Sequence, residues 1–159
     1  MRVAPREAIS SARPGGLART WEFRSQISDL ALRDPDDLER VLDTAIRNGV
    51  DGLVIFQDAL TLPLRQRIVD DARRRWLPSI VEAGGWARAG GLLSYGPSAA
   101  GQARQCASFI ARILKGESPA DLPIQQPTEL DFLINLTTAQ AFGLTIPHSV
   151  LVQATELIQ

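Results

Sequence analysis

The sequence has 159 residues but contains only one cysteine, one histidine and one lysine. The single cysteine, Cys106, excludes an internal disulfide framework and any CxxC metal or redox motif. The single histidine, His148, cannot build a histidine-based metal cluster, and no Gly-x-Ser-x-Gly nucleophile motif accompanies it. P-loop and Gly-x-Gly-x-x-Gly phosphate motifs are missing as well. We therefore predict no metal, no cofactor and no enzymatic activity.

Long apolar runs are also missing, so no segment is expected to span a membrane. The first residues include arginines but lack the apolar core of a secretory signal peptide. A hydrophobic content of 45% and a net charge of -1 are typical of a soluble globular domain. We expect residues 1–17, rich in proline, glycine and serine, to form a flexible leader before a single domain over residues 18–159.

Basic residues form no dense run with interleaved aromatic side chains, so nucleic-acid binding is not predicted. The chain instead alternates strand and helix patterns. Asp34 and Pro35 are typical of a helix start, and the apolar residues that follow them repeat at helical spacing. Residues 52–56 are typical of a buried parallel strand, and a second helix is expected between Thr61 and Trp76.

The middle of the chain continues the alternation. Short strands are expected at residues 79–81 and 91–95, on either side of a glycine-rich loop. A long helix is expected from Ser98 to Leu114. One face of this helix carries the apolar residues Ala103, Cys106, Ala107, Ile110, Ile113 and Leu114. We expect that face, with Cys106, to pack in the core.

The last part of the chain changes character. Residues 117–128 contain three prolines and are expected to form an extended, hinge-like crossing segment. A strand at residues 129–136, a short helix at 137–142 and a final helix after Pro147 complete the pattern. Such alternation predicts a three-layer α/β domain with a parallel sheet and helices on both of its faces.

Ligands of parallel α/β sheets bind at the carboxyl ends of the strands. Gln57 and Asp58 follow the first clear strand, and Glu82 follows the second. Ser94 and Tyr95 stand at the end of the third strand. These five residues are our candidate ligand-binding residues.

Two of these residues have alternative interpretations. Asp58 can meet a ligand ammonium or hydroxyl group, or it can serve as a helix-start carboxylate. A phosphoacceptor role in a receiver-type domain is disfavoured because Lys115, the only lysine, ends a helix. Tyr95 can stack on a ligand or lie half-buried in a loop. Trp86, in the glycine-rich loop, could cover a ligand, whereas Trp21 and Trp76 have the pattern of packing residues.

Three stretches carry a resemblance to a known family, namely residues 33–60, 89–98 and 112–147. The last is the most specific, since it combines an ILKG helix end, a PADLP turn, a QPT step and an INL-x-TA-x-A-x-GLTIP finish. From about Thr20 onward the chain resembles the C-terminal part of ABC transporter substrate-binding proteins of the tryptophan/tyrosine-binding-like group.

The resemblance implies a type I periplasmic-binding fold, in which two α/β lobes close on a small ligand and then dock on an ABC permease. By position, Gln57 and Asp58 match strand-end ligand residues of the family, and Glu82 matches an acidic residue at the cleft mouth. Ser94 and Tyr95 match the turn beside the cleft. The family functions in the periplasm or outside the cell, although this chain shows no signal peptide.

The chain also departs from the family. It corresponds mainly to the second lobe and lacks most of the N-terminal lobe. Its cleft loop has Ala83, Gly84, Gly85 and then Arg88 after Glu82. The favoured interpretation is a solute-binding component, or a truncated remnant, of an ABC import system that binds a small molecule such as an amino acid. The alternative is a ligand-binding module without a transport role, or one that self-associates as a homodimer through its exposed hinge face.

Overall fold

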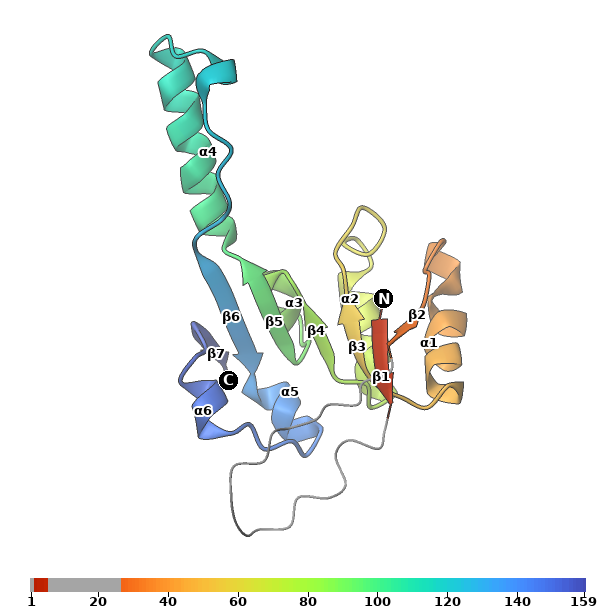
Figure 1. Cartoon of the computed structure of the whole chain (residues 1–159). Coiled ribbons are helices and arrows are strands. Elements are labelled where there is room, and N and C mark those ends of the chain that lie inside the picture. The colour runs from red at the N-terminus through yellow and green to blue at the C-terminus, as the bar shows by residue number, and fades with distance from the viewer. Residues whose placement is uncertain (1, 6–26) are drawn as a thin grey trace.

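A computed structural model describes residues 2–5 and 27–159, which form one seven-stranded sheet with helices packed on it (Figure 1). The strand order is β2-β1-β3-β4-β5-β6-β7. The strands are β1 Arg2–Pro5, β2 Ser28–Asp29, β3 Val50–Ile55, β4 Ser79–Val81, β5 Leu93–Pro97, β6 Leu130–Asn135 and β7 Glu156–Ile158. The helices are η2 Pro35–Asp37, α1 Leu38–Arg47, α2 Arg65–Arg74, α3 Gly84–Arg88, α4 Ala99–Leu114, η3 Pro119–Asp121, α5 Leu136–Ala141 and α6 His148–Leu151.

The sheet is mixed. Strands β3, β4 and β5 are parallel, and β6 and β7 are parallel to each other. Strand β6 is antiparallel to β5, and β1 is antiparallel to both of its neighbours. The α/β class is confirmed, and the three central parallel strands direct their carboxyl ends to one edge of the sheet.

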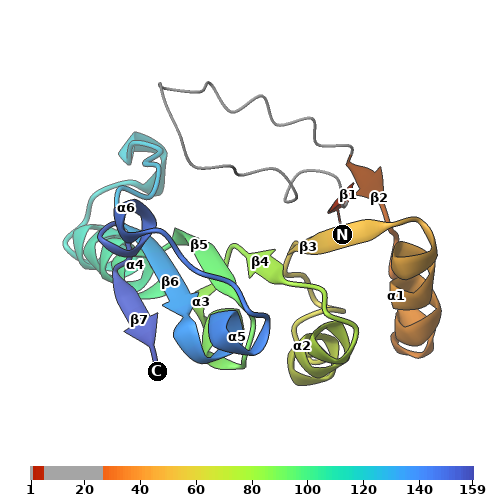
Figure 2. The same ribbon diagram turned by 90° about the horizontal axis from the view of Figure 1, so that it is seen from below.

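Most of the helices cover one face of this sheet. Figure 2 shows α1, α2, α3 and α5 on the same side of the strands, with the short α6 on the other side. The core between the helices and the sheet includes Leu42, Leu53, Ile68 and Trp86, each at most 2% exposed. Burial of this apolar surface stabilises the body of the molecule. Among the described residues, no helix has the length and apolar character needed to cross a membrane.

The start of α1 follows the expected pattern. Asp34 caps η2, because its Oδ1 accepts a hydrogen bond from the backbone N–H of Asp36 at 2.9 Å. Pro35 occupies the first position of the turn, where no backbone donor is needed. Four apolar residues of the helix then face the core, namely Leu38, Val41, Leu42 and Ala45. The prediction for this helix is confirmed.

Two expected elements differ in the structure. The glycine-rich segment expected to be a loop contains α3, a short helix that begins at Gly84. The final helix ends at Leu151, and β7 replaces its expected continuation. Thr155 fixes this change, since its Oγ1 accepts from the backbone N–H of Phe132 at 2.9 Å and donates to the carbonyl oxygen of Phe132. The pairing of β7 with β6 thus overrides the helical pattern of the sequence after Pro147.

Three side chains also differ in burial from what the sequence predicts. Cys106 is exposed on α4, which buries no side chain, so the prediction that its apolar face packs in the core is wrong. Trp76 is 67% exposed rather than packed in the core. Trp86, expected in an open loop, is fully buried in the core.

The remaining predictions concern the less regular segments. The expected leader, residues 1–17, contains β1, and its other residues, together with Trp21, lie outside the described part of the chain. The expected crossing segment, residues 117–128, contains only the short η3.

Candidate functional site

Of the predicted ligand residues, Gln57 and Asp58 follow β3 and Glu82 follows β4, whereas Ser94 and Tyr95 lie within β5. Ile55 of β3 pairs with Val81 of β4, and Val81 pairs with Ser94 of β5. The next residue of each strand therefore reaches the same edge. We call the group formed by Phe56, Gln57, Asp58, Glu82 and Tyr95 the strand-end edge.

Gln57 and Glu82 are in direct contact at this edge. The backbone N–H of Gln57 donates to Oε1 of Glu82 at 2.7 Å. The indole Nε1–H of Trp86 donates to Oε1 of Gln57 at 2.9 Å, which ties the edge to the buried core. The second oxygen of Glu82, Oε2, is buried and has no hydrogen-bond partner among the described residues. Buried carboxylate oxygens normally have a partner, so Oε2 is an unfilled acceptor.

Asp58 is engaged by its own loop. Its Oδ1 accepts hydrogen bonds from the backbone N–H groups of Leu60, at 2.9 Å, and Thr61, at 2.7 Å. In return, Oγ1 of Thr61 accepts from the backbone N–H of Asp58 at 2.9 Å. The hydrogen bonds between the Asp58 carboxylate and Thr61, together with the one from the backbone N–H of Leu60, favour the charged form and hold the pKa of Asp58 below its ordinary value. This geometry matches the capping interpretation of Asp58, with the carboxylate ordering the loop between β3 and α2.

Ser94 lies within the sheet, one residue below the edge. Its side chain is 1% exposed, and its Oγ has no hydrogen-bond partner among the described residues. Two residues further along β5, Gly96 touches the backbone of Glu82 so closely that a Cβ there would lie 2.0 Å from the carbonyl oxygen of Glu82. The absence of a side chain at Gly96 therefore lets β5 approach the residue that carries the unfilled acceptor.

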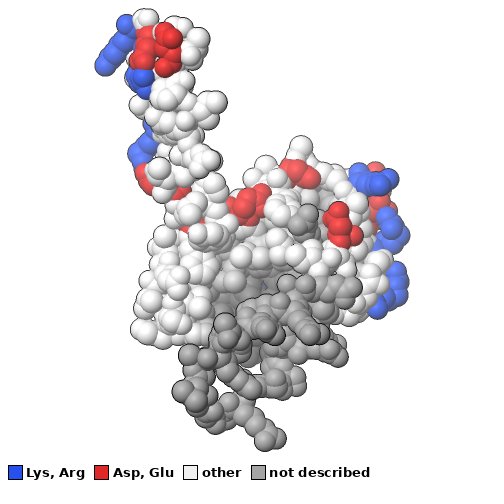
Figure 3. All heavy atoms as spheres, in the orientation of Figure 1, with Lys and Arg blue, Asp and Glu red and all other residues white. Residues whose placement is uncertain are grey.

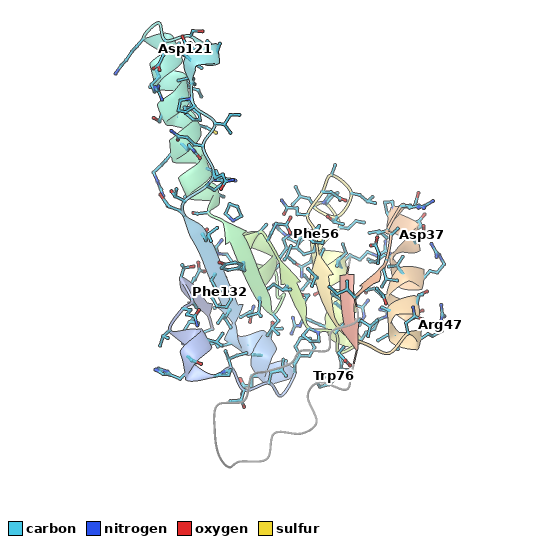
Figure 4. All side chains as sticks on the ribbon, in the orientation of Figure 1. Asp37, Arg47, Phe56, Trp76, Asp121 and Phe132 are labelled. Atoms are coloured by element: carbon cyan, nitrogen blue, oxygen red, sulfur yellow. The ribbon has the colours of Figure 1, made fainter. Side chains whose placement is uncertain are left out.

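Aromatic side chains line the edge. Tyr95 is 53% exposed and contacts Phe132 of β6 edge to face, with ring centroids 5.8 Å apart. Phe56, labelled at the end of β3 in Figure 4, is 55% exposed. Neither phenylalanine was among the predicted site residues. The position of Phe56 directly before Gln57 was the available signal for it, whereas Phe132 required the pairing of β5 with β6.

The charge near this edge is acidic. In Figure 3, the surface between α4 and α1 shows acidic groups and no basic groups. Arg88, which stood in the predicted cleft loop, is engaged elsewhere, because its Nη2 contacts Oε2 of Glu156 on β7 at 2.5 Å. This contact raises the pKa of Arg88 and lowers that of Glu156. Within the described ranges, no three His, Cys, Asp or Glu side chains gather into a metal site.

Two hollows lie away from the strand-end edge. One, of about 670 Å³, separates α4 from residues 125–129. The other, of about 430 Å³, lies between α2 and α5 beside Trp76 and Phe142. The case for the strand-end edge as a binding site rests on Glu82 and the aromatic side chains.

Comparison with known proteins shows what the chain is similar to. The model of the family described as ABC transporter substrate binding protein matches residues 23–158. The chain belongs to the ABC transporter substrate-binding protein family. No curated protein sequence matches it significantly.

Solved structures agree with this assignment. A domain from Streptococcus pneumoniae, described in complex with L-Trp, is 26% identical with a TM-score of 0.71, covering 81% of this chain and 44% of that one. A conserved domain protein from Vibrio cholerae is 25% identical with a TM-score of 0.70, covering 78% and 42%. A ligand-free, open substrate-binding protein with adhesive properties from Clostridium difficile, 18% identical with a TM-score of 0.58 and covering 78% and 41%, shares the fold. The expected periplasmic-binding fold is confirmed, and the chain spans less than half of each of these structures.

Proposed function

We propose that this chain is a solute-binding lobe of an ABC import system and that it holds an amino acid at the strand-end edge. In this proposal Oε2 of Glu82 accepts a hydrogen bond from the ligand ammonium group, while the rings of Phe56 and Tyr95 contact the ligand side chain. Asp58 orders the loop, and Gln57 positions Glu82. Ser94 supports the strand from below.

The observation that carries the proposal is the unfilled acceptor of Glu82. A cationic ligand group would supply the partner that a buried carboxylate oxygen normally has. The surrounding acidic surface favours the same ligand charge (Figure 3). The two exposed aromatic rings favour an apolar or aromatic ligand side chain over a small polar one.

The comparisons support the same ligand class. The streptococcal structure is described in complex with L-Trp, an amino acid with an ammonium group and an aromatic side chain. The family consists of binding proteins that work outside the cytoplasmic membrane with an ABC permease. We therefore propose a permease as the protein partner, and binding rather than catalysis as the activity.

Calorimetric titration with L-tryptophan, L-leucine and L-aspartate tests the proposal. One lobe provides only one side of a cleft, so we expect L-tryptophan to bind with a Kd of about 1 mM, L-leucine to bind more weakly and L-aspartate not to bind. Glu82→Gln keeps the shape of the side chain but removes its charge. Because hydrogen bonds to charged groups contribute about 1.5–3 kcal/mol, this variant should bind at least about tenfold more weakly.

Glu39→Gln is the matched control, because Glu39 is an exposed carboxylate in the first turn of α1, away from the strand-end edge. It should bind as the wild type does. Equal heats from the wild type and Glu82→Gln would remove Glu82 from the site, and the absence of any amino acid heat would contradict the proposed ligand class.

A further inference from the structure

Arg65 differs from the other half-buried arginines of the described residues, because its guanidinium has no partner there. Arg75 forms an ion pair with Asp43 at 2.9 Å, and Arg112 forms one with Glu117. Arg65 is half-buried as well, yet no described residue forms a hydrogen bond or an ion pair with its guanidinium. Arginine side chains that are withdrawn from water are normally paired with an anionic group. Arg65 therefore lacks the anionic partner that its burial favours.

Arg65 is the first residue of α2 and lies beside the start of α3. Strands β3 and β4 are parallel, so the helices that follow them begin at the carboxyl ends of the strands, and Figure 2 shows both helices on the same side of the sheet. A Cβ on Gly85, in the first turn of α3, would lie 2.7 Å from Nη1 of Arg65. The absence of a side chain at Gly85 thus makes room for the guanidinium at this end of the sheet.

A continuous set of contacts joins Arg65 to Glu82, the carboxylate of the proposed ammonium site. Oε1 of Glu82 accepts from the backbone N–H of Gln57 at 2.7 Å, and Oε1 of Gln57 accepts from the indole N–H of Trp86 at 2.9 Å. Trp86 directly follows Gly85, against which Arg65 packs. Arg65 and Glu82 form no ion pair with each other or with any other described residue. This end of the sheet therefore holds two opposite charges that do not neutralise each other.

The neighbouring arginines are engaged elsewhere. Arg88, in the segment after Glu82, pairs with Glu156 on β7 at 2.5 Å. Arg67, one turn position further along α2, donates to the carbonyl oxygen of Pro35 at 3.3 Å. Arg65 is therefore the basic side chain that stays available to a ligand at the start of these two helices.

We propose, on the basis of the amino acid binding proposed above, that Arg65 binds the α-carboxylate of the ligand whose ammonium group Glu82 holds. A guanidinium binds a carboxylate through two parallel N–H···O bonds, which fix the orientation of the bound group. A free α-amino acid carries its ammonium and carboxylate groups on the same carbon, so one ligand supplies both missing partners. An amine without the carboxylate would leave the guanidinium unpaired. The site therefore selects free α-amino acids over the corresponding amines.

Titrations with L-tryptophan and tryptamine, followed through the backbone amide NMR signals, test this selectivity. Tryptamine keeps the ammonium group and the indole ring but has no carboxylate. The wild type should bind L-tryptophan at least about tenfold more tightly than tryptamine, because hydrogen bonds between charged groups are among the strong ones. Arg65→Gln should bind L-tryptophan at least about tenfold more weakly than the wild type does, and it should bind the two ligands with equal affinity.

Arg73→Gln is the matched control. It makes the same change of charge at the other end of α2, where Arg73 is exposed and has no partner among the described residues. It should keep both the wild-type affinity and the preference for L-tryptophan. Arg65→Gln should unfold at the same urea concentration as the wild type, because it removes no hydrogen bond within the described residues. An equal loss of affinity for both ligands in Arg65→Gln would indicate a general effect on the fold and would overturn the role of Arg65.

Glu82→Gln separates a failure of this role from a failure of the proposed function. It should weaken the binding of both ligands, since both carry the ammonium group, and it should keep the preference for L-tryptophan. A protein that is weakened by Glu82→Gln, but binds L-tryptophan normally with Arg65→Gln, would overturn the role of Arg65 and leave the proposed function standing. A wild type that binds neither ligand would overturn both.

Discussion

Replacement of Gly96 by alanine tests the packing that holds Glu82 in place. A Cβ at this position would lie 2.0 Å from the carbonyl oxygen of Glu82 and 2.8 Å from its carbonyl carbon. An ordinary contact between such atoms is about 3.5 Å, so the two segments must separate by more than 1 Å. The obstructing atoms are backbone, and they follow directly on the pairing of β4 with β5. A side-chain rotation therefore cannot relieve the clash.

The expected cost of Gly96→Ala is that of overpacking, about 1–3 kcal/mol in the free energy of unfolding. Urea unfolding followed by circular dichroism should show a lower midpoint with an unchanged slope. The same shift of the Glu82 backbone should weaken amino acid binding, because the carboxylate moves with it.

Gly101→Ala is the matched control. Gly101 lies inside α4, and a Cβ there would lie 3.1 Å from Cβ and Oε2 of Glu129, so a shift of a few tenths of an ångström relieves the contact. Alanine also favours the helix over glycine by up to about 1 kcal/mol. Gly101→Ala should therefore be neutral or stabilising. A Gly96→Ala protein as stable as the wild type would refute the claim that Gly96 sets the distance between β5 and Glu82.

The other predictions concern the loop and the core beneath the edge. Asp58→Asn removes a carboxylate whose folded pKa lies below its ordinary value of 3.8, so the stability that Asp58 contributes is present above that value and is lost as the pH falls through the folded pKa. The wild type should accordingly be more stable than Asp58→Asn at pH 6, and the urea midpoints of the two proteins should converge as the pH falls below 3.8; a difference that does not change with pH would contradict the assigned cause. Trp86→Ala should cost about 3–5 kcal/mol in urea unfolding, since it empties a fully buried site, and a cost under about 1 kcal/mol would contradict that burial.

The sequence was sufficient for elements whose signals are local. Asp34 and Pro35 set the start of the first helical segment, and Ser98 caps α4 as its position indicated. Strand β4 lies where a short apolar segment follows Pro78. In each case the determining contacts lie within a few residues along the chain, so the pattern carries the information.

Elements determined by distant contacts were not predictable in the same way. Strand β7 forms because Ile158 can pair with Asn135 of β6, which a helical pattern after Pro147 does not reveal. The start of α3 at Gly84 lies against Leu133 of β6, 3.3 Å from where a Cβ would stand, so a glycine that suggested a loop serves close packing. Tertiary pairing overrides local preference at both places.

The candidate site was predicted as a set of strand-end residues, but not as a network. The rule for parallel sheets identified Gln57, Asp58 and Glu82 as neighbours. It could not show that the loop itself uses Asp58, or that Trp86 donates to Gln57 from the core. The apolar face of α4 was likewise predicted only in part, because helical spacing reveals that a face is apolar without revealing what covers it.

The most direct test of amino acid binding at the strand-end edge is an NMR titration that follows the tryptophan indole N–H signals. The indole of Trp86 donates to Gln57 at the edge, whereas Trp76 lies at the opposite end of the sheet (Figure 4). Tryptophan-to-phenylalanine variants assign the signals. With L-tryptophan at about 10 mM, binding at the edge predicts a saturable shift of the Trp86 signal and none at Trp76. An unmoved Trp86 signal, or a shift confined to Trp76, would contradict the proposed site.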